Sequence, residues 1–158
     1  MREAFLGADA DILLWSERQA AALRRLAERH PDAGVDWPRV IDTVEGAGRG
    51  LLHEVEAETV RALYWHLMLA AHPRAANRRE WLEAAERGRH ASRAHMEAGA
   101  RSRVELRRLY ARAVREVRLL GPICAAEPLP LLGECPIFLD EWLSGDLDTE
   151  SVVRRVRA

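Results

Sequence analysis

The stretch from Trp37 to Ala71 constrains the fold most, because apolar residues recur in it every three or four positions. The members of this stripe are Val40, Val44, Ala47, Leu51, Val55, Thr59, Ala62, His66 and Leu69. Such spacing is typical of one face of an α-helix. From Ala62 to Ala71 no charged residue occurs, so this end has no polar face and must be covered on every side. The sequence therefore predicts a long helix with other segments packed around its C-terminal end.

Capping and breaking residues predict the other helices. A first helix is expected to begin after Asp11, to end near Arg29 ahead of a proline, and to present a face made of Ile12, Trp15, Gln19, Leu23 and Leu26. Asp36 is the expected cap of the long helix. Inside it, Gly46, Gly48 and Gly50 favour a continuous or gently bent helix over one that is split near Gly48. Further helices are predicted at about 78–98, with Gly99 as the stop, at 106–120, and at 137–143, where Phe138, Leu139, Trp142 and Leu143 are placed for docking.

These elements predict an all-α fold: an antiparallel bundle of four main helices, with the long central helix at about 37–71 and a short C-terminal capping helix at about 137–143. The chain has 158 residues, which is enough for a single domain with a sizeable core. We expect one helical domain over 1–158, with loosely held ends at 1–8 and 147–158.

Composition and the ends of the chain exclude several classes of protein. The first residues lack the apolar region of a signal peptide. The longest uncharged apolar helical run is far shorter than the roughly 20 residues of a membrane span. Cys124 and Cys135 are too few for a disulfide scaffold and are not spaced as a C-x-x-C motif. We expect a cytoplasmic protein that does not bind a membrane.

Motifs for catalysis or metal binding are missing from the sequence. None of the 6 His has a glutamate three residues before it, as a di-metal bundle requires, and no H-E-x-x-H motif occurs. No serine lies in a G-x-S-x-G turn, and the glycines at 46–50 do not have the spacing of a dinucleotide-binding turn. The sequence therefore predicts no catalytic residue, no metal site and no cofactor, and an enzyme is not favoured.

His66 is the most notable single residue, because it lies in the apolar stripe beside Trp65. A buried histidine needs a hydrogen-bond partner. We favour a structural histidine bonded to a carboxylate or a carbonyl. The alternative is a ligand-binding or proton-handling group in a pocket formed with Trp65.

The basic residues are concentrated in one segment. Residues 74–118 hold 13 Arg and 6 acidic residues, in a chain whose 24 basic residues are all arginine. The candidate surface for nucleic acid or an acidic partner consists of Arg78, Arg79, Arg87, Arg89, Arg107, Arg108, Arg112 and Arg115. Only Trp81 and Tyr110 are aromatic there, so base stacking is not indicated. Pairing of these arginines with acidic residues elsewhere in the chain is the favoured interpretation.

Scattered positions along residues 8 to 146 resemble a bacterial family known as "domain of unknown function 29". They are Asp11, Trp15, Gln19, Ala20, Leu23, Arg24, Asp36, Trp37, Glu45, Gly48, Arg49, His66, Leu67, Trp81, Tyr110, Cys135, Pro136, Leu139 and Leu143. The chain departs from the family pattern at Gly46 and Gly50. The resemblance implies an all-helical domain without an established activity, so no functional residue can be carried over.

Function is therefore predicted only by class. The first hypothesis is a non-enzymatic helical interaction module, as a homo-oligomer or with a protein partner. Nucleic-acid binding through the arginines is the alternative and is not favoured. A metal-binding or enzymatic bundle using His66 is the weakest.

Overall fold

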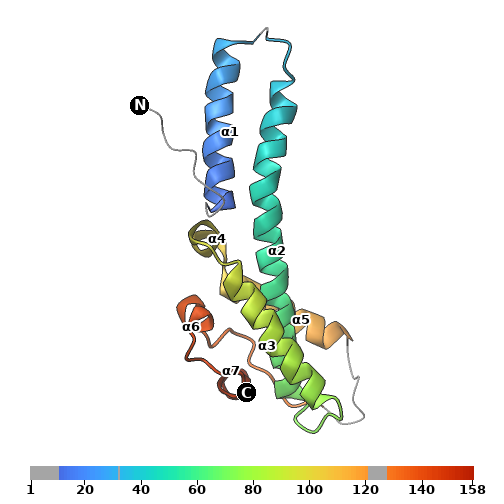
Figure 1. Ribbon diagram of the computed structural model, residues 1–158. Coiled ribbons are helices and arrows are strands. Elements are labelled where there is room, and N and C mark those ends of the chain that lie inside the picture. The colour runs from blue at the N-terminus through green and yellow to red at the C-terminus, as the bar shows by residue number, and fades with distance from the viewer. Residues whose placement is uncertain (1–10, 32, 121–127) are drawn as a thin grey trace. The chain divides into compact units, whose positions relative to one another are not determined.

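A computed structural model describes residues 11–31, 33–120 and 128–158 (Figure 1). The described chain contains four long helices: α1 (Ile12–Arg29), α2 (Trp37–Ala71), α3 (Arg78–Ala94) and α5 (Leu106–Leu120). Three short helices complete it: α4 (Ala98–Arg103), α6 (Leu139–Leu143) and α7 (Thr149–Arg155). Outside the helices, the described segments contain one isolated β-bridge, between Leu131 and Arg157. The predicted all-α class is confirmed.

The long helix is unbroken from Trp37 to Ala71, so the prediction of a continuous helix through Gly46, Gly48 and Gly50 is confirmed. No helix in the described part of the chain is long and apolar enough to cross a membrane. The described residues form two compact units. The first lies within residues 11–54 and 96–103, and the second within 55–95 and 104–158.

The first unit is a helical hairpin. Helix α1 and the first half of α2 lie side by side and antiparallel, with α4 at the N-terminal end of α1 (Figure 1). Asp11 begins α1 as predicted, because its Oδ1 accepts a hydrogen bond from the Leu14 N–H at 3.0 Å. Its Oδ2 accepts a second one from the Gly99 N–H at 2.5 Å, which ties α4 to the start of α1. One aspartate therefore caps one helix and holds another.

Gly48 lets the two helices of the hairpin approach closely. A Cβ at this position would lie 2.1 Å from Ser16 Oγ and 3.3 Å from the Leu13 Cα. Ser16 is fixed in turn, since its hydroxyl donates to the Leu13 carbonyl at 2.9 Å. The residues of α1 that are buried are accordingly Leu13, Ser16 and Ala20.

The predicted face of the first helix is not the one that contacts α2. Of its members, Ile12, Trp15 and Leu26 are exposed and Leu23 is half-buried. The contact line of α1, which is the row of side chains that meets α2, lies about a quarter-turn further around the helix, where the side chains fit beside Gly48.

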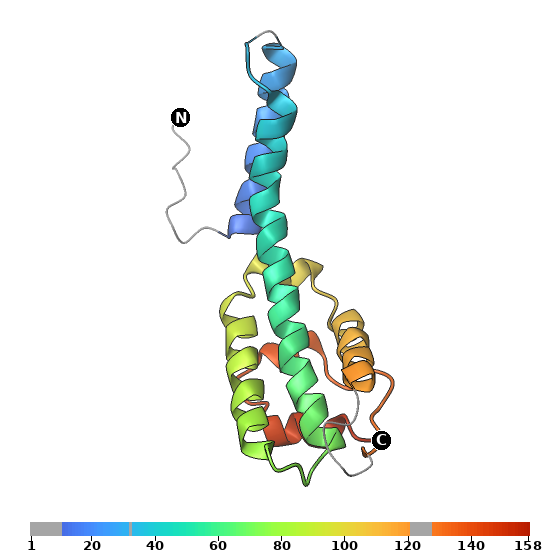
Figure 2. The same ribbon diagram turned by 90° about the vertical axis from the view of Figure 1, so that its right-hand side faces the viewer.

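The second unit encloses the end of α2. The C-terminal half of α2 has α3 and α5 on two sides and the segment 128–158 on a third (Figure 2). Residues 62–71 are buried except for Trp65, which is half-buried, as the absence of a polar face predicted. Helix α3 approaches closely through Gly88, where a Cβ would lie 3.1 Å from the Ala62 Cβ.

Three details of the C-terminal part differ from expectation. The third helix ends at Ala94, and Gly99, predicted as its stop, lies within α4. The capping helix begins at Leu139, and Phe138, expected to dock, is 69% exposed. A loosely held end at 147–158 was predicted, but α7 buries Val152 and Val153 there, because its apolar residues pack into the second unit. The expected loose end at 1–8 lies outside the described residues.

Replacing Gly48 tests the close approach. Gly48→Ala should lower the free energy of unfolding by about 1–3 kcal/mol, because the added methyl overpacks the contact with α1. Gly50→Ala is the matched control, since nothing lies within 4 Å of a Cβ there. It should raise stability by up to about 1 kcal/mol through helix propensity. Urea unfolding followed by circular dichroism measures both, and equal effects would contradict the close packing.

Candidate functional site

His66, the candidate pocket residue, is completely buried in the second unit. Its Nδ1–H donates to the Ala62 carbonyl at 2.7 Å, so the neutral ring carries its acceptor at Nε2. No hydrogen-bond partner for Nε2 lies among the described residues. The ring instead makes an edge contact with Trp142, with 5.4 Å between centroids. The pKa of His66 is lowered to about 4, mainly by burial and to a smaller extent by the charge of Arg89, whereas the hydrogen bond to Ala62 acts to raise it.

Trp65 does not share this environment. It lies 5.0 Å from the Tyr64 ring and 6.2 Å from the Trp81 ring, centroid to centroid. The two residues that the sequence suggested as one pocket are therefore engaged by different partners. The hydrogen bond of His66 to a backbone carbonyl fits the structural role that the sequence favoured.

Arg89 is the arginine that the structure separates from the other candidates. It projects from α3 into the second unit and is buried, and its guanidinium donates to the carbonyls of Trp142 at 3.1 Å, Ser144 at 2.8 Å and Leu147. It also lies over the Trp142 ring, 5.5 Å from the centroid. Burial lowers the pKa of Arg89, and the charge of Arg93 adds to this. Arg89 therefore acts as a clamp that holds residues 142–147, the end of α6 and the segment after it, against α3.

Two hydroxyls complete this buried polar cluster. Thr59 donates to the Val55 carbonyl at 2.8 Å, and Ser92 Oγ lies 2.7 Å from Thr59 Oγ1. Ser92 also accepts a hydrogen bond from the Trp142 indole N–H at 3.4 Å. These groups satisfy one another, and within the described segments no three His, Cys, Asp or Glu side chains are arranged to hold a metal ion. The hydrogen bonds of this cluster therefore join α2, α3 and α6.

Most of the other candidate arginines have acidic partners. Arg78 pairs with Glu150, Arg79 and Arg87 with Glu83, Arg108 with Glu56, and Arg112 with Glu116. For Arg107 and Arg115 no acidic oxygen lies within 4.0 Å in the part of the chain that the structure describes. The eight candidates thus do not form one uncommitted basic face. Arg78 and Arg108 pair with acidic residues elsewhere in the chain, as the favoured interpretation expected, whereas Arg79, Arg87 and Arg112 pair within their own helices.

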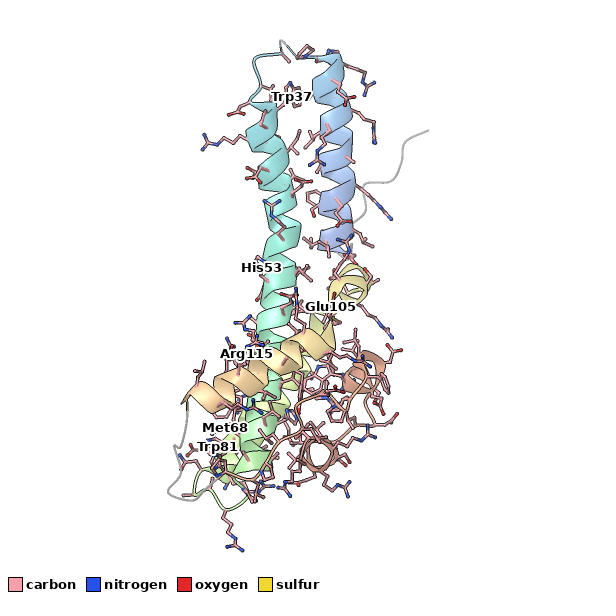
Figure 3. The ribbon with its side chains drawn as sticks, turned by 180° about the vertical axis from the view of Figure 1, so that it is seen from behind. Trp37, His53, Met68, Trp81, Glu105 and Arg115 are labelled. Atoms are coloured by element: carbon pink, nitrogen blue, oxygen red, sulfur yellow. The ribbon has the colours of Figure 1, made fainter. Side chains whose placement is uncertain are left out.

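A group of partly exposed large apolar side chains lies on the hairpin of the first unit, whereas Leu119, Leu129 and Phe138 are the exposed large apolar residues of the second unit. Ile12 is 41% exposed, Trp15 36%, Leu26 37% and Val40 38%. In Figure 3, side chains crowd around Met68 and Trp81 in the second unit, whereas those of the hairpin project into open space. The sequence predicted that Ile12, Trp15 and Leu26 share a face of the first helix, but not that this face lies away from α2. We call the exposed apolar surface of the hairpin the hairpin face; its members are Ile12, Trp15, Ala22, Leu26, Val40 and Ala47.

These residues lie on the same side of the hairpin. At 100° per residue, the α1 members lie about 110° from the line that contacts α2, and the α2 members about 70–100° from the line that contacts α1, in the same rotational sense. In an antiparallel pair, equal senses of rotation point to the same face. The ion pair between Arg24 and Glu45, at 2.6 Å, lies in the opposite sense on both helices and marks the polar face. One face of the hairpin is therefore apolar and the other charged.

The edges of the hairpin face differ in charge. The edge along α1 carries Arg18, Arg25 and Arg29, all exposed. The edge along α2 carries the exposed acids Asp36 and Glu54 and the exposed Arg39. The described residues provide no ion-pair partner for any of these six. A partner helix would therefore meet an apolar stripe bordered by three arginines on one side and by two acids and one arginine on the other.

Comparisons with known proteins agree with the fold. A family model described as "Domain of unknown function DUF29" matches residues 9–147, as the resemblance predicted. A crystal structure of an α-helical protein of unknown function from Rhodospirillum rubrum ATCC 11170 is similar, with a TM-score of 0.80 and 21% identity. The similarity covers 98% of this chain and 100% of that one, and at this identity it concerns the fold alone. No curated protein matches the chain.

Burial of His66 predicts a pH-dependent stability. In the unfolded chain His66 takes up a proton as the pH falls below its ordinary pKa of 6.5. In the folded chain it does so only near pH 4. Stability should therefore fall by about 1.4 kcal/mol per pH unit below 6.5, or about 2 kcal/mol between pH 7 and pH 5. Urea unfolding at both pH values measures it. His66→Leu should flatten the dependence, whereas His53→Leu, at an exposed position, should preserve it; a dependence unchanged in His66→Leu would contradict this origin.

The clamp made by Arg89 predicts a large loss on truncation. Arg89→Met leaves three carbonyls without their donor and should lower the free energy of unfolding by roughly 3 kcal/mol. Arg87→Met, on the exposed side of the same helix, removes only a solvated ion pair and should cost less than about 0.5 kcal/mol. Urea unfolding compares the two, and similar losses would show that Arg89 is not a clamp.

Proposed function

The chain belongs to the DUF29 family, and from this premise we propose that it is a non-enzymatic interaction module whose hairpin face binds an amphipathic helical surface. The cytoplasm remains the predicted location. The buried polar cluster supports this class of function, because its groups are used in joining helices to one another.

The observation that carries the proposal is the exposure of large apolar side chains in regular helical positions. Ile12, Trp15, Gln19, Ala22 and Leu26 follow one another at steps of three and four. This is the spacing of a helical seam that packs against other helices. Covering the exposed part of Ile12, Trp15, Leu26 and Val40 would contribute roughly 1 kcal/mol for each side chain.

The charges beside the face define the chemistry of the partner. An α-helical surface would fit if it carried an apolar stripe, acidic residues opposite Arg18, Arg25 and Arg29, and basic or neutral residues opposite Asp36 and Glu54. Complementary borders of this kind steer association and fix the orientation of the two surfaces.

Binding of nucleic acid remains the alternative function. It would use Arg107 and Arg115 of α5, for which the described residues provide no acidic partner. Association with DNA or RNA that weakens steeply with salt and is lost when both are neutralised would favour this alternative.

Photocrosslinking in cells tests the interaction module. A benzophenone side chain introduced at Ala22 or at Ala47 should give a discrete crosslinked product of higher mass, because both positions lie on the hairpin face. Ala57, an exposed alanine of the second unit, is the matched control and should give none. The measurement is the mass of the products on a denaturing gel and by mass spectrometry. Absence of a product from both face positions, or equal yield from Ala57, would refute the proposed function.

A further inference from the structure

We infer that the partner of the hairpin face is a second copy of this chain, with α1 of each copy packed on α2 of the other. This inference rests on the proposed function and names its partner. Its first support is that the hairpin face contains apolar residues from both helices. A surface built this way can match itself when two copies face each other, and two-fold pairing is the commonest form of self-association.

The geometry of such a pair follows from the hairpin. When the two-fold axis runs parallel to the helices, each α1 lies over α2 of the other copy, and neighbouring helices run antiparallel. Gly48 lies beside Leu13 and Ser16, and the Trp37 indole N–H donates to the His30 carbonyl at 3.1 Å. These contacts determine which residues of α1 and α2 lie at the same level, that is, at the same height along the hairpin. Leu26 lies at the level of Val40, so Leu26 of one copy would pack on Val40 of the other.

The charges at the borders select this arrangement. The two-fold parallel to the helices brings the basic border of α1 beside the acidic border of α2 of the other copy. Arg25 and Arg29 then lie near the level of Asp36, a carboxylate whose only described contact is the cap to the Arg39 N–H at 3.2 Å. The other face-to-face arrangement would place α1 on α1 and set the two basic borders together. The α2 border carries two acids and Arg39, whereas the α1 border carries three arginines, so the net charges favour α1 on α2 over α1 on α1.

The size of the face sets the strength of the pair. Helix α1 has 18 residues and is about 27 Å long, and two helices side by side are about 20 Å wide. Two such faces give an interface of roughly 1,000 Å² in total, at the lower end of specific interfaces. We therefore expect a dimer that dissociates in the micromolar range.

The first test is the mass of the purified full chain as a function of concentration. Sedimentation velocity between about 1 and 200 µM should show a change from 17.9 kDa to twice that mass. Trp15→Glu should remain monomeric over this range, with at least a tenfold weaker association. Phe138→Glu, which places the same change at the exposed aromatic residue of the second unit, should dimerise as the unaltered chain does. A monomer at all concentrations, or equal loss in Phe138→Glu, overturns the inference.

The second test determines which helices meet. Two populations, one carrying Leu26→Cys and the other Val40→Cys, are mixed and oxidised, and the parent chain with its own cysteines gives the background. A disulfide-linked heterodimer above that background is expected. Efficient linking of Leu26→Cys to Ile12→Cys instead would indicate α1 on α1 and overturn the arrangement.

A third measurement examines the charged border. Asp36→Asn keeps a side chain that can cap α2 but removes the charge, and should weaken dimerisation about twofold to fivefold. The Arg25→Gln, Arg29→Gln double variant should weaken it similarly. Combining all three changes should cost less than the sum of the two effects, because they break the same pairs. Strict additivity contradicts the pairing.

The mass of the photocrosslinked product distinguishes the proposed interaction module from the proposed self-pairing. A product at twice the mass of the chain supports both the interaction module and self-pairing. A product containing a different protein supports the module and overturns self-pairing. Lack of a face-specific product overturns both.

Discussion

The enclosure of the C-terminal end of α2 is the constraint on which the second unit depends. This end has no polar face, so its side chains and its last carbonyl groups must both find partners within the protein. Leu69 receives a hydrogen bond from Arg78 at 3.3 Å, Ala70 from Arg157 at 3.2 Å, and Ala71 from the Leu129 N–H at 2.8 Å. The donors come from α3, from the last residues and from the segment before α6. These hydrogen bonds therefore fix the C-terminal segment against the end of α2.

The first half of α2, in contrast, is covered only in part. Val55, Thr59, Ala62, His66 and Leu69 of the apolar stripe are buried, whereas Val40 and Ala47 of the same stripe are exposed. Only α1 and the short α4 accompany α2 in the first unit, and two helices can bury one face of each other but not two. The stripe thus continues beyond the residues that cover it. That mismatch is the physical reason to expect a further helical surface there.

The sequence predicted those features that depend on neighbouring residues. Asp11 caps α1, Asp36 caps α2, and both helices have the expected bounds, because caps and prolines act locally. The features that depend on distant residues could not be read in this way. Gly99 resembled a helix stop, but its N–H binds Asp11 from the start of the chain.

The candidate site shows the same division between local and distant effects. His66 was expected in the core because its position in the stripe is a local property. Arg89 was grouped with the surface arginines, because neither its residue type nor the sequence around it distinguishes it from them. Its three carbonyl partners lie more than 50 residues later, between Trp142 and Leu147, and only the folded chain brings them to α3. The pairing of Arg78 with Glu150 likewise joins residues 72 positions apart.

The hairpin face follows from the way in which the hairpin itself is packed. Gly48 brings α2 so close to α1 that only small or flexible side chains fit on the contact line, and Ser16 and Ala20 occupy it. A helix that uses its small residues inside the pair must turn Ile12, Trp15 and Leu26 elsewhere. Close packing inside the hairpin and an apolar face outside it are therefore two consequences of the same order of residues along α1.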